Sequence, residues 1–491
     1  MNNRIRNRSL ALRVMTADDA AGFVQAGDTV GVSGFRTGCA KVVPVAIAKR
    51  AKKHGFKINL LSGASIGVNV DHALAEADAL FRRMPFQQDP ALRRAINAGS
   101  IRFSDPHLSD LPRQLLDGDL GVVDVAIIEA IAINDDGSIV PSMSVGCSPT
   151  FVSLARKVIV EINMAQPLAL EGIHEIPAYT GAKRAVQQVD ERIGRSAIAC
   201  APNKIVAIVI THEPDPGLGA PESDADTSRI AQHLIDLFSH EVAVGHLSPN
   251  LLPLEVGVGA VSNAVLRGFA NSPFSNLTMY SEVIQDAAFE LIECGKLRFA
   301  SASAIVLSPE KQAFVLAHFD DYADKIVLRP QEVSNSPETI RFLDLIAINT
   351  ALEADIYGNV NSTHINGTHM LNGIGGAGDF ARNARLAIFV TKSVAKDGNI
   401  SSIVPMVTHV DHTEHDVDVI ITEQGAADLR GLSPRERAQL VIDRCVHPKF
   451  RPQMQAYFDR ACLKGGHTPH LLGEAFAWHE RFTETGSMLA A

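Results

Sequence analysis

Short apolar runs alternate with helical patterns along the whole chain. In the segment 223–240, Ile230, Leu234, Leu237 and Phe238 recur at the spacing that places an apolar stripe on one face of a helix. Apolar runs of strand length occupy residues 29–32, 57–61, 123–128, 157–162, 204–210, 343–348, 386–390 and 418–422. This alternation predicts an α/β fold with layers of helices on mainly parallel sheets.

A weak internal repeat indicates how the chain is organised. The apolar run 123–129 leads through 136–140 and a loop with Gly146 to the strand 157–162; the run 343–349 leads through 357–360 and the loop 373–378 to the strand 385–390. The matching order predicts two related open α/β domains, residues 1–215 and 222–491, joined in the Pro- and Gly-rich stretch 213–221. We expect the active site in the cleft between them.

Composition and charge exclude several classes of protein. The 491 residues are 46% apolar and 20% charged, and no apolar run approaches the ~20 residues of a membrane span. The start has no signal-peptide apolar region, so we expect an intracellular protein. A net charge of -10 without a basic block argues against nucleic-acid binding. The six cysteines are far apart and form no C-x-x-C pair, which argues against a zinc ribbon or a disulfide framework.

Two carboxylates are candidates for nucleophilic chemistry. Glu282 stands where the apolar strand 277–280 is expected to hand over to a helix, on the face where α/β proteins bind ligands; the following helix N-terminus would favour an anion there. Glu423 ends the apolar run 420–422 in the same way and competes for the role. Position alone does not choose between them.

Two glycine-rich loops offer backbone N–H groups to an anion. The loop 257–259 ends a predicted strand, and the loop 373–378 precedes a predicted helix start. Such loops can hold an oxyanion or a phosphate, although tight turns alone would explain the glycines as well. Neither loop fits the dinucleotide G-x-G-x-x-G context or the ATP-binding phosphate loop, so NAD and ATP are not indicated.

Metal and serine chemistry are less consistent with the sequence. The cluster 408–416 contains three histidines and two aspartates, but its spacing matches no helical zinc motif, and a hydrogen-bonded polar loop is the better interpretation. Asp105, His107 and Ser109 lie too close together to fold back as a catalytic triad. The residues therefore favour carboxylate chemistry without a metal.

Several motifs, taken together, resemble one enzyme family. They are S-E-V-I-Q-D at 281–286, G-V-G at 257–259, G-N-V-N-S-T-H at 358–364, N-G-I-G-G-A-G-D-F at 372–380, H-V-D-H-T-E-H-D-V at 409–417 and T-E-Q-G at 422–425. The chain resembles the acetyl-CoA hydrolase/transferase family of class I coenzyme A transferases along its whole length. It is most similar to the branch that acts on succinyl-CoA with acetate and propionyl-CoA with succinate.

The resemblance implies a reaction and a set of site residues. It implies that CoA moves between an acetyl, propionyl or succinyl thioester and a carboxylic acid such as acetate or succinate, through a glutamyl-CoA thioester on Glu282. Backbone N–H groups of Val258 and Gly376 would stabilise the oxyanions. Glu423 would orient groups in the site or act as an acid. The residues implied to bind CoA are Gly257, Gly259, Asn335, Asn372, Gly375 and Lys396.

Two other functions use the same sequence features. A hydrolase would let water resolve the intermediate on Glu282, whereas a CoA-ester sensor would bind without reacting and would not need the glutamate. The resemblance implies no cofactor beyond CoA itself, no metal, a cytoplasmic location, and a homodimer or larger homo-oligomer. The loop 35–41 is bulkier and more polar than in relatives, and Cys147 replaces an uncharged polar residue, so the preferred acid could differ from acetate.

Overall fold

The computed structural model describes residues 3–177, 186–219 and 224–490. Contacts divide the chain into two compact units, each built from separate segments. Unit 1 comprises Met1–Gly219, Met279–Asp286 and Phe299–Leu343; unit 2 comprises Ala220–Thr278, Ala287–Arg298 and Asp344–Ala491. The proposed domain boundaries, 1–215 and 222–491, stay a prediction, and Ala220 and Pro221 of the predicted linker lie outside the described residues.

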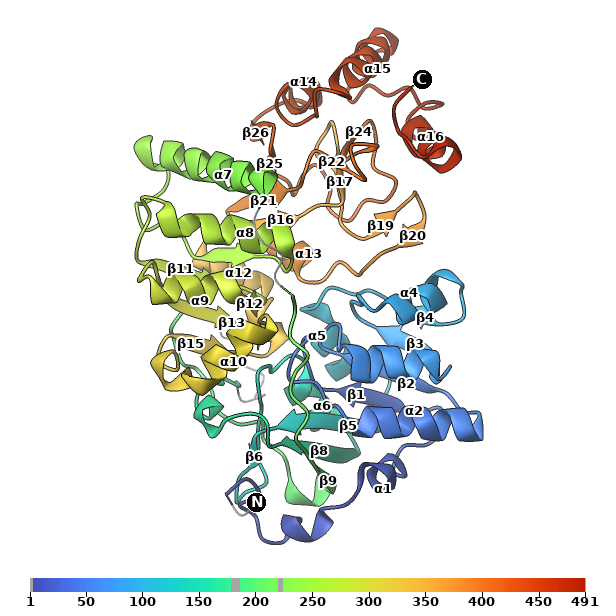
Figure 1. Ribbon diagram of the computed structural model, residues 1–491, viewed down its shortest axis with the longest axis vertical. Coiled ribbons are helices and arrows are strands. Elements are labelled where there is room, and N and C mark those ends of the chain that lie inside the picture. Colours follow the sequence, from blue (N-terminus) through green and yellow to red (C-terminus); the bar gives the residue numbers. More distant parts are fainter. Residues whose placement is uncertain (1–2, 178–185, 220–223, 491) are drawn as a thin grey trace. The chain divides into compact units, whose positions relative to one another are not determined.

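A seven-stranded sheet forms the centre of unit 1 (Figure 1). Its order is β4-β3-β2-β1-β5-β8-β9, and every neighbouring pair is parallel. The strands are β1 (Thr29–Val32), β2 (Ile58–Ser62), β3 (Leu80–Met84), β4 (Arg102–Phe103), β5 (Val125–Ala130), β8 (Lys157–Asn163) and β9 (Ile205–Thr211). All six residues of β5 are buried, as expected for a central parallel strand covered on both faces.

Helices pack on this sheet around an apolar core. The core joins Val30, Val32 and Leu60 of the strands to Ile47 and Leu92 of the helices α2 and α4, which lie beside β1–β3 in Figure 1. The helices of unit 1 are α1 (Ala17–Ala21), α2 (Val43–His54), α3 (Ala73–Glu76), α4 (Pro90–Asn97), α5 (Asp110–Leu116), α6 (Ser148–Leu154), α10 (Pro309–Ala317), α11 (Gln331–Ser334) and α12 (Pro337–Leu343). Parallel strands thus end at one edge of the sheet, where loops after β1–β4 gather.

A second sheet has eight strands in the order β15-β13-β11-β10-β16-β21-β25-β26. Its members are β10 (Leu254–Val256), β11 (Leu277–Tyr280), β13 (Leu297–Ala302), β15 (Ile326–Leu328), β16 (Ile346–Thr350), β21 (Leu386–Val390), β25 (Val419–Thr422) and β26 (Gly425–Asp428). Within unit 2, β10, β16, β21 and β25 are parallel neighbours and β26 is antiparallel to β25. The prediction of an α/β fold with mainly parallel sheets is confirmed.

Helices and small strands complete unit 2. The helices are α7 (Ala225–Ala243), α8 (Ala260–Gly268), α9 (Asp286–Glu293), α13 (Ala377–Asn383), α14 (Pro434–Arg444), α15 (Arg451–Lys464) and α16 (Ala477–Thr485). The helix α7 buries Ile230, Leu234 and Phe238, three members of the predicted stripe, and begins with a capping box between Asp224 and Thr227. The short strands are β17 (Glu353–Asp355), β18 (Val360–Asn361), β19 (His364–Ile365), β20 (His369–Met370), β22 (Val394–Ala395), β23 (Ile400–Ser401) and β24 (Ile403–Val404).

The two segments of the proposed repeat form matching elements. In the first, β5 is followed by β7 (Ile139–Val140), α6 and β8; in the second, β16 is followed by β18, α13 and β21. In both, the first and last strands are parallel neighbours in a sheet. The remaining short strands in the described part of the chain are β6 (Ala132–Ile133), β12 (Val283–Ile284) and β14 (Ala304–Ile305).

Candidate active site

Glu282 lies in unit 1 between β11 and β12, and only 8% of its surface is exposed. Its carbonyl accepts a hydrogen bond of 2.9 Å from the Ser303 N–H, and β12 pairs in parallel with β14 directly afterwards. Because the backbone is hydrogen-bonded on this side, the position of the Glu282 backbone is fixed by the strand pair. The candidate nucleophile is therefore held on regular structure rather than on a mobile surface loop.

The expected direct passage from a strand to a helix at Glu282 is wrong in detail. Val283 and Ile284 form β12, and α9 begins only at Asp286. The carboxylate at this helix start belongs to Asp286, which accepts the Ser308 N–H at 2.9 Å and the Ser308 hydroxyl at 2.6 Å. β-Branched residues favour extended backbone, which explains the inserted strand. The helix N-terminus therefore favours the charge of Asp286 rather than that of Glu282.

Asn335 belongs to the same unit and follows α11. It is fully buried, its side-chain oxygen accepts the Ser334 hydroxyl at 2.9 Å, and its N–H donates to the Gln331 carbonyl. The Tyr280 hydroxyl donates to the Val333 carbonyl at 2.6 Å. Tyr280 precedes Glu282 by two residues, as Val333 precedes Asn335. The structure therefore ties together the two segments that carry these predicted site residues.

The glycine loop after β10 holds three predicted residues of unit 2. The Gly257 N–H donates to the Ile348 carbonyl at 3.0 Å, which continues the pairing of β10 with β16. A Cβ at Gly257 would lie 3.0 Å from the Asn349 side-chain oxygen, while the Asn349 amide donates to Glu255 at 3.0 Å. The φ angle of Gly259, 149°, is one that other residues rarely adopt. Both glycines, which flank Val258, are thus required by close packing or by conformation.

The second glycine loop leads into α13. The Asn372 amide donates to the carbonyls of Ser362 at 3.0 Å and Gly373 at 2.9 Å, so it shapes the loop from inside. Gly375 has a φ angle of 62°, and the Gly376 carbonyl accepts the Phe380 N–H in the first turn of α13. Because α13 connects the parallel strands β16 and β21, its start lies at the edge of the sheet where these strands end.

Lys396 and Glu423 lie on two hairpins of unit 2. Lys396 is at the turn between β22 and β23, with its ammonium 5.0 Å from the centre of the Phe482 ring. Glu423 is in the two-residue turn between β25 and β26, and its carboxylate accepts the Ser393 N–H at 2.8 Å, the Ser393 hydroxyl and the Gln424 amide at 2.9 Å. Burial alone would raise the pKa of Glu423, but these hydrogen bonds outweigh it and lower the pKa. Glu423 is therefore ionised at neutral pH.

The predicted residues thus fall into two sets, one in each unit. Glu282 and Asn335 belong to unit 1. Residues 257–259, 372–376, 396 and 423 belong to unit 2, where the chain passes the carboxyl ends of the parallel strands β10, β16, β21 and β25. The carboxyl ends of parallel strands are where open α/β sheets bind ligands.

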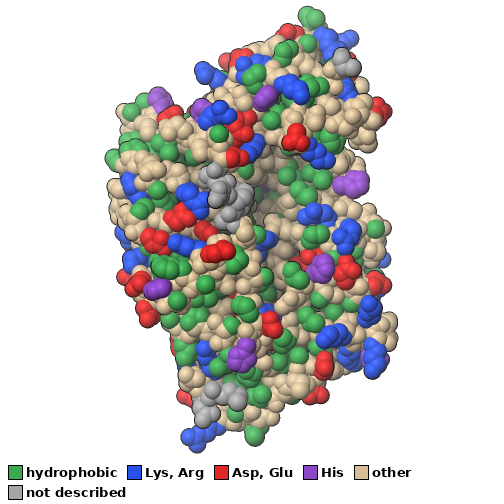
Figure 2. All heavy atoms as spheres, viewed as in Figure 1, with side chains coloured by type: hydrophobic (Ala, Val, Ile, Leu, Met, Phe, Trp, Pro, Cys, Tyr) green, Lys and Arg blue, Asp and Glu red, His purple; other side chains and the backbone are tan. Residues whose placement is uncertain are grey.

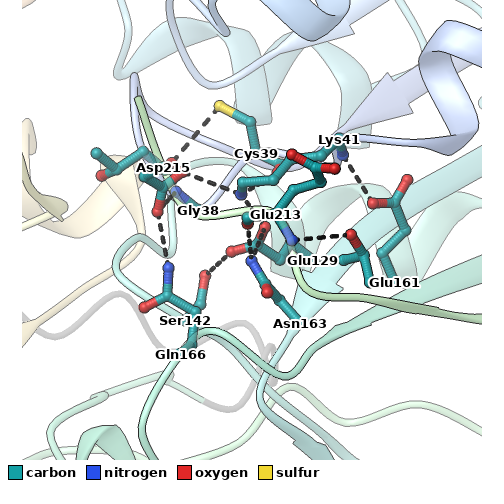
Figure 3. A network of polar contacts seen from close by, with 12 residues as sticks. Gly38, Cys39, Lys41, Glu129, Ser142, Glu161, Asn163, Gln166, Glu213 and Asp215 are labelled. Carbon is teal, nitrogen blue, oxygen red and sulfur yellow. Dashed lines mark hydrogen bonds and ion pairs between the residues drawn. The ribbon is translucent and has the colours of Figure 1, made fainter. Parts of the chain in front are cut away.

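Sequence reasoning missed a buried charged network in unit 1 (Figure 3). The Lys41 ammonium pairs with Glu129 and lies 3.0 Å from an Asp215 carboxylate oxygen. The Glu161 carboxylate accepts the backbone N–H groups of Lys41 at 2.7 Å and Val43 at 2.7 Å, at the start of α2. Burial raises the pKa of Glu129, and the negative charge of Asp215, which shares the same lysine, raises it further. The network anchors the loop that follows β1.

The sequence does carry a signal for this network. Glu129 and Glu161 both interrupt apolar runs that form the central strands β5 and β8, and Lys41 stands among small and apolar residues before α2. A charged residue inside a buried strand requires a partner, since an unpaired buried charge is costly. Asp215 gives no such signal, because it lies in the Pro-rich stretch predicted to be a linker.

Buried thiols offer no competing nucleophile in the loops near Glu282. Burial raises the pKa of both Cys39 and Cys147 well above the ordinary range. Because the thiolate is the reactive form, these cysteines are unreactive at neutral pH. The departure at Cys147 from the family pattern is thus a packing feature.

The segment 408–416 forms a hydrogen-bonded polar loop beside β18. Asp411 accepts the Ser362 N–H at 2.7 Å and the Thr363 hydroxyl, and it lies 3.3 Å from the His409 ring nitrogen. The His409 ring stacks on that of His364 at 3.9 Å between centres. In the described ranges, no group of three or more His, Cys, Asp or Glu residues has the arrangement of a metal site.

Three further observations concern cavities, surface and membranes. A cavity of about 470 Å³ in unit 1 is lined by residues such as Asp136, Arg195 and Cys200, and by none of the predicted site residues. Acidic and basic side chains are interspersed on the face drawn in Figure 2. Among the helices of the described residues, none combines the length and the apolar character needed to span a membrane.

Comparison with protein families gives two matches that together cover most of the chain. The acetyl-CoA hydrolase/transferase N-terminal domain matches residues 1–209, and the C-terminal domain of the same name matches residues 313–458. The N-terminal match contains the sheet of unit 1 except the end of β9, and the C-terminal match contains α13, Lys396 and Glu423.

Full-length relatives include transferases and hydrolases. The chain is 49% identical over 493 aligned residues to a succinyl-CoA:acetate CoA-transferase of Clostridium kluyveri, covering 99% of this chain and 92% of the relative. It is 43% identical to a propanoyl-CoA:succinate CoA transferase of Escherichia coli (97% and 98% covered). It is also 43% identical to an acetyl-CoA hydrolase of Schizosaccharomyces pombe (99% and 98%).

Solved structures share the fold. RipA from Yersinia pestis superimposes with a TM-score of 0.74 at 22% identity, covering 93% of this chain and 99% of RipA. A 4-hydroxybutyrate CoA-transferase from Porphyromonas gingivalis gives a TM-score of 0.65 at 21% identity, with 92% and 98% covered.

Proposed function

Because the chain belongs to the acetyl-CoA hydrolase/transferase family, we propose that it moves CoA between short-chain acyl-CoAs and carboxylic acids through a glutamyl-CoA thioester on Glu282. It is an enzyme, either a CoA-transferase or an acetyl-CoA hydrolase, as its full-length relatives are. The observation that carries the proposal is the placement of Glu282, a largely buried carboxylate on a backbone fixed by β12 and β14.

The reaction balances without a proton or a redox partner. The Glu282 carboxylate attacks the thioester carbonyl, and the carbon–sulfur bond breaks. The CoA thiolate departs, and a mixed acyl-glutamyl anhydride is formed. The thiolate then attacks the glutamyl carbonyl and expels the first acid as a carboxylate. The second acid reverses the sequence on the glutamyl-CoA thioester, so the energy of the thioester bond is conserved.

Each step passes through a tetrahedral oxyanion that needs hydrogen-bond donors. We assign this role to the backbone N–H groups of Val258 and Gly376, each worth about 3–4 kcal/mol of transition-state stabilisation. For CoA binding we propose the two glycine loops with Asn335, Asn372 and Lys396. Gly259 supports this role, because no atom lies within 4 Å of where its Cβ would be, so a ligand can approach the backbone there.

The test is to trap the covalent intermediate. The protein is mixed with acetyl-CoA or succinyl-CoA without an acceptor acid, and its intact mass is measured. Borohydride reduction and peptide mapping then identify the modified residue. We expect a CoA adduct on Glu282 that is discharged by added acetate or succinate. Glu282→Gln should form no adduct, whereas the control Glu310→Gln, an exposed glutamate in α10 of the same unit, should behave as the wild type.

Other outcomes would contradict the proposal in distinct ways. An adduct on another residue would refute the assignment of the nucleophile. The absence of both an adduct and CoA release would favour a protein that binds CoA esters without reacting.

The second candidate function is acetyl-CoA hydrolysis, favoured by the full-length similarity to the fungal hydrolase. Hydrolysis would use the same glutamate, with water in place of the second acid. The two functions are separated by the ratio of acyl transfer to CoA release at saturating acceptor. A transferase should release CoA into water much more slowly than it forms the second thioester.

We propose a homodimer as the assembly. Sedimentation velocity measures this directly: a single species with the mass of one 52.7 kDa chain would refute it.

A further inference from the structure

Loops at the carboxyl ends of β2 and β3 are tied together by one buried arginine. Arg83 is fully buried and pairs with Asp71 at 2.8 Å. Its remaining N–H groups donate to the carbonyls of Ala64, Pro85 and Phe86. The loop after β1 joins this group, because the Arg36 N–H donates to the Ser65 carbonyl at 2.8 Å. The edge of the sheet is thus a preorganised frame for the side chains that it carries.

Two further arginines in this frame meet at Gln88. The Arg36 guanidinium donates to the Gln88 side-chain oxygen, and the Arg93 guanidinium donates to the Gln88 carbonyl at 3.2 Å. The Nε atoms of both are buried without an acceptor, and within the described ranges neither guanidinium forms an ion pair. The neighbouring Asp89 carboxylate is engaged by the first N–H groups of α4 and lies 3.2 Å from His72.

A buried amide directly precedes Gln88, the residue at which these arginines meet. Gln87 has no exposed surface, and neither its side-chain nitrogen nor its oxygen has a hydrogen-bond partner among the described residues. Buried amides are normally hydrogen-bonded, because an unpaired one costs free energy. Burial also lowers the pKa of Arg36, as expected for a cation without a compensating anion. Together the three side chains have the donors and the charge to bind an anion.

We propose that Arg36, Arg93 and Gln87 bind a second carboxylate of the acid substrate, so that the enzyme prefers dicarboxylic acids and their CoA esters. The guanidinium fork matches a carboxylate with two parallel hydrogen bonds, and Gln87 adds a neutral donor. The inference rests on the proposed function, because it specifies which acid discharges the intermediate on Glu282.

The loop that carries Arg36 is linked to Glu282 within unit 1. The Thr37 hydroxyl donates to the Ile305 carbonyl at 2.6 Å, and the Ser144 hydroxyl donates to the Thr37 carbonyl at 2.9 Å. Ser303, two residues before Ile305, donates to the Glu282 carbonyl. The short segment Ser303–Ile305 therefore contacts both the loop that carries Arg36 and the backbone of the nucleophile. Because of this linkage, we assign the bound anion to the acid substrate rather than to a distant part of CoA.

The test compares two acids that differ only at the far end. Succinate and butanoate have the same number of carbon atoms, with a carboxylate in one where the other has a methyl group. We measure kcat/KM for each acid with acetyl-CoA as donor. Arg36→Gln and Arg93→Gln should each lower the succinate-to-butanoate ratio by on the order of 100-fold. The control Arg94→Gln, the next residue of α4, is 68% exposed and pairs with Glu76, so it should leave the ratio unchanged.

Several outcomes would overturn the inference. An equal loss with both acids would mean that the arginines bind a shared part such as a CoA phosphate. An unchanged ratio, or a wild type without preference for succinate, would also refute it. Circular dichroism checks folding, and Arg36→Lys, which keeps the charge but not the fork, should lower the ratio less than Arg36→Gln.

A binding measurement separates this inference from the proposed function. Isothermal titration of the wild type should show binding of succinate but not of butanoate, with loss of succinate binding in Arg36→Gln. If this holds while no adduct forms on Glu282, the proposed reaction fails and the carboxylate site stands. If the adduct forms but succinate and butanoate bind alike, the carboxylate site fails and the reaction stands.

Discussion

Ser393 donates two hydrogen bonds to the carboxylate of Glu423, one from its N–H at 2.8 Å and one from its hydroxyl. Ser393 follows β21 and directly precedes β22, while Glu423 follows β25, so the contact joins the ends of two neighbouring parallel strands. The hairpin that starts at Ser393 carries Lys396. Glu423 thus fixes the hairpin of a proposed CoA-binding residue, and we infer that it is a positioning residue.

Replacing Glu423 separates positioning from proton transfer. Glu423→Ala leaves the buried Ser393 N–H without an acceptor, so we expect kcat/KM for acyl-CoA to fall about tenfold to 100-fold, mostly through KM. Glu423→Gln should recover much of the loss, because an amide oxygen still accepts from Ser393. Steady-state kinetics of both variants check this. A glutamine variant as inactive as the alanine variant would instead indicate an acid–base role.

The buried lysine in Figure 3 should be important for stability. Lys41→Met leaves Glu129 and Asp215 buried without their cation, and we expect a loss of about 3–5 kcal/mol in the free energy of unfolding. Adding Glu129→Gln should restore part of it, because one buried charge is then removed. Urea unfolding of the two variants measures both values. A double variant no more stable than Lys41→Met would show that the two side chains are not coupled.

The buried side chain of His174 should make the free energy of unfolding depend on pH in the acidic range. Its Nε2 donates to the Ser142 carbonyl at 2.8 Å, its Nδ1 is buried without a partner, and burial lowers its pKa from 6.5 to about 4. The unfolded chain therefore binds the proton first, so stability should fall as pH drops from about 6.5 to 4, by about 3 kcal/mol in total. Urea unfolding across this range measures the slope.

A matched pair of variants isolates this contribution. His174→Gln should flatten the acid side of the stability profile, whereas His467→Gln, at an exposed position, should keep the wild-type slope. Equal slopes in all three proteins would contradict the assignment.

Gly63 packs closely against Gly34, near the loop that carries Arg36, and this contact gives another prediction. A Cβ at Gly63 would lie 2.8 Å from the Gly34 carbonyl, which is backbone and cannot rotate away. We expect Gly63→Ala to lower the free energy of unfolding by about 1–3 kcal/mol. Gly473→Ala has no atom within 4 Å of the new methyl group and should be nearly neutral. Denaturant titration compares them; similar values for both would show that the loop yields to the methyl group.

Regular elements were predictable because their signal is local. The strands at 29–32, 277–280 and 386–390 have the predicted bounds, and the others differ by a few residues at their ends. Apolar runs and helical periodicity depend only on neighbours along the chain, so burial in a parallel sheet can be predicted from the sequence. The inserted strand β12 was missed, because two residues are too few to show a period.

The sequence by itself determined the α/β class, the family and the motifs that carry the candidate nucleophile, because these are properties of local pattern and of similarity to relatives. Tertiary structure alone decided which distant side chains meet: Lys41 with Asp215, Arg36 with Gln88, and Glu423 with Ser393. Hydrogen bonds and ion pairs act over a few ångströms in space, whereas these residues are separated along the chain by distances that no sequence period encodes. Only the folded sheet, which brings the ends of its strands to one edge, makes them neighbours.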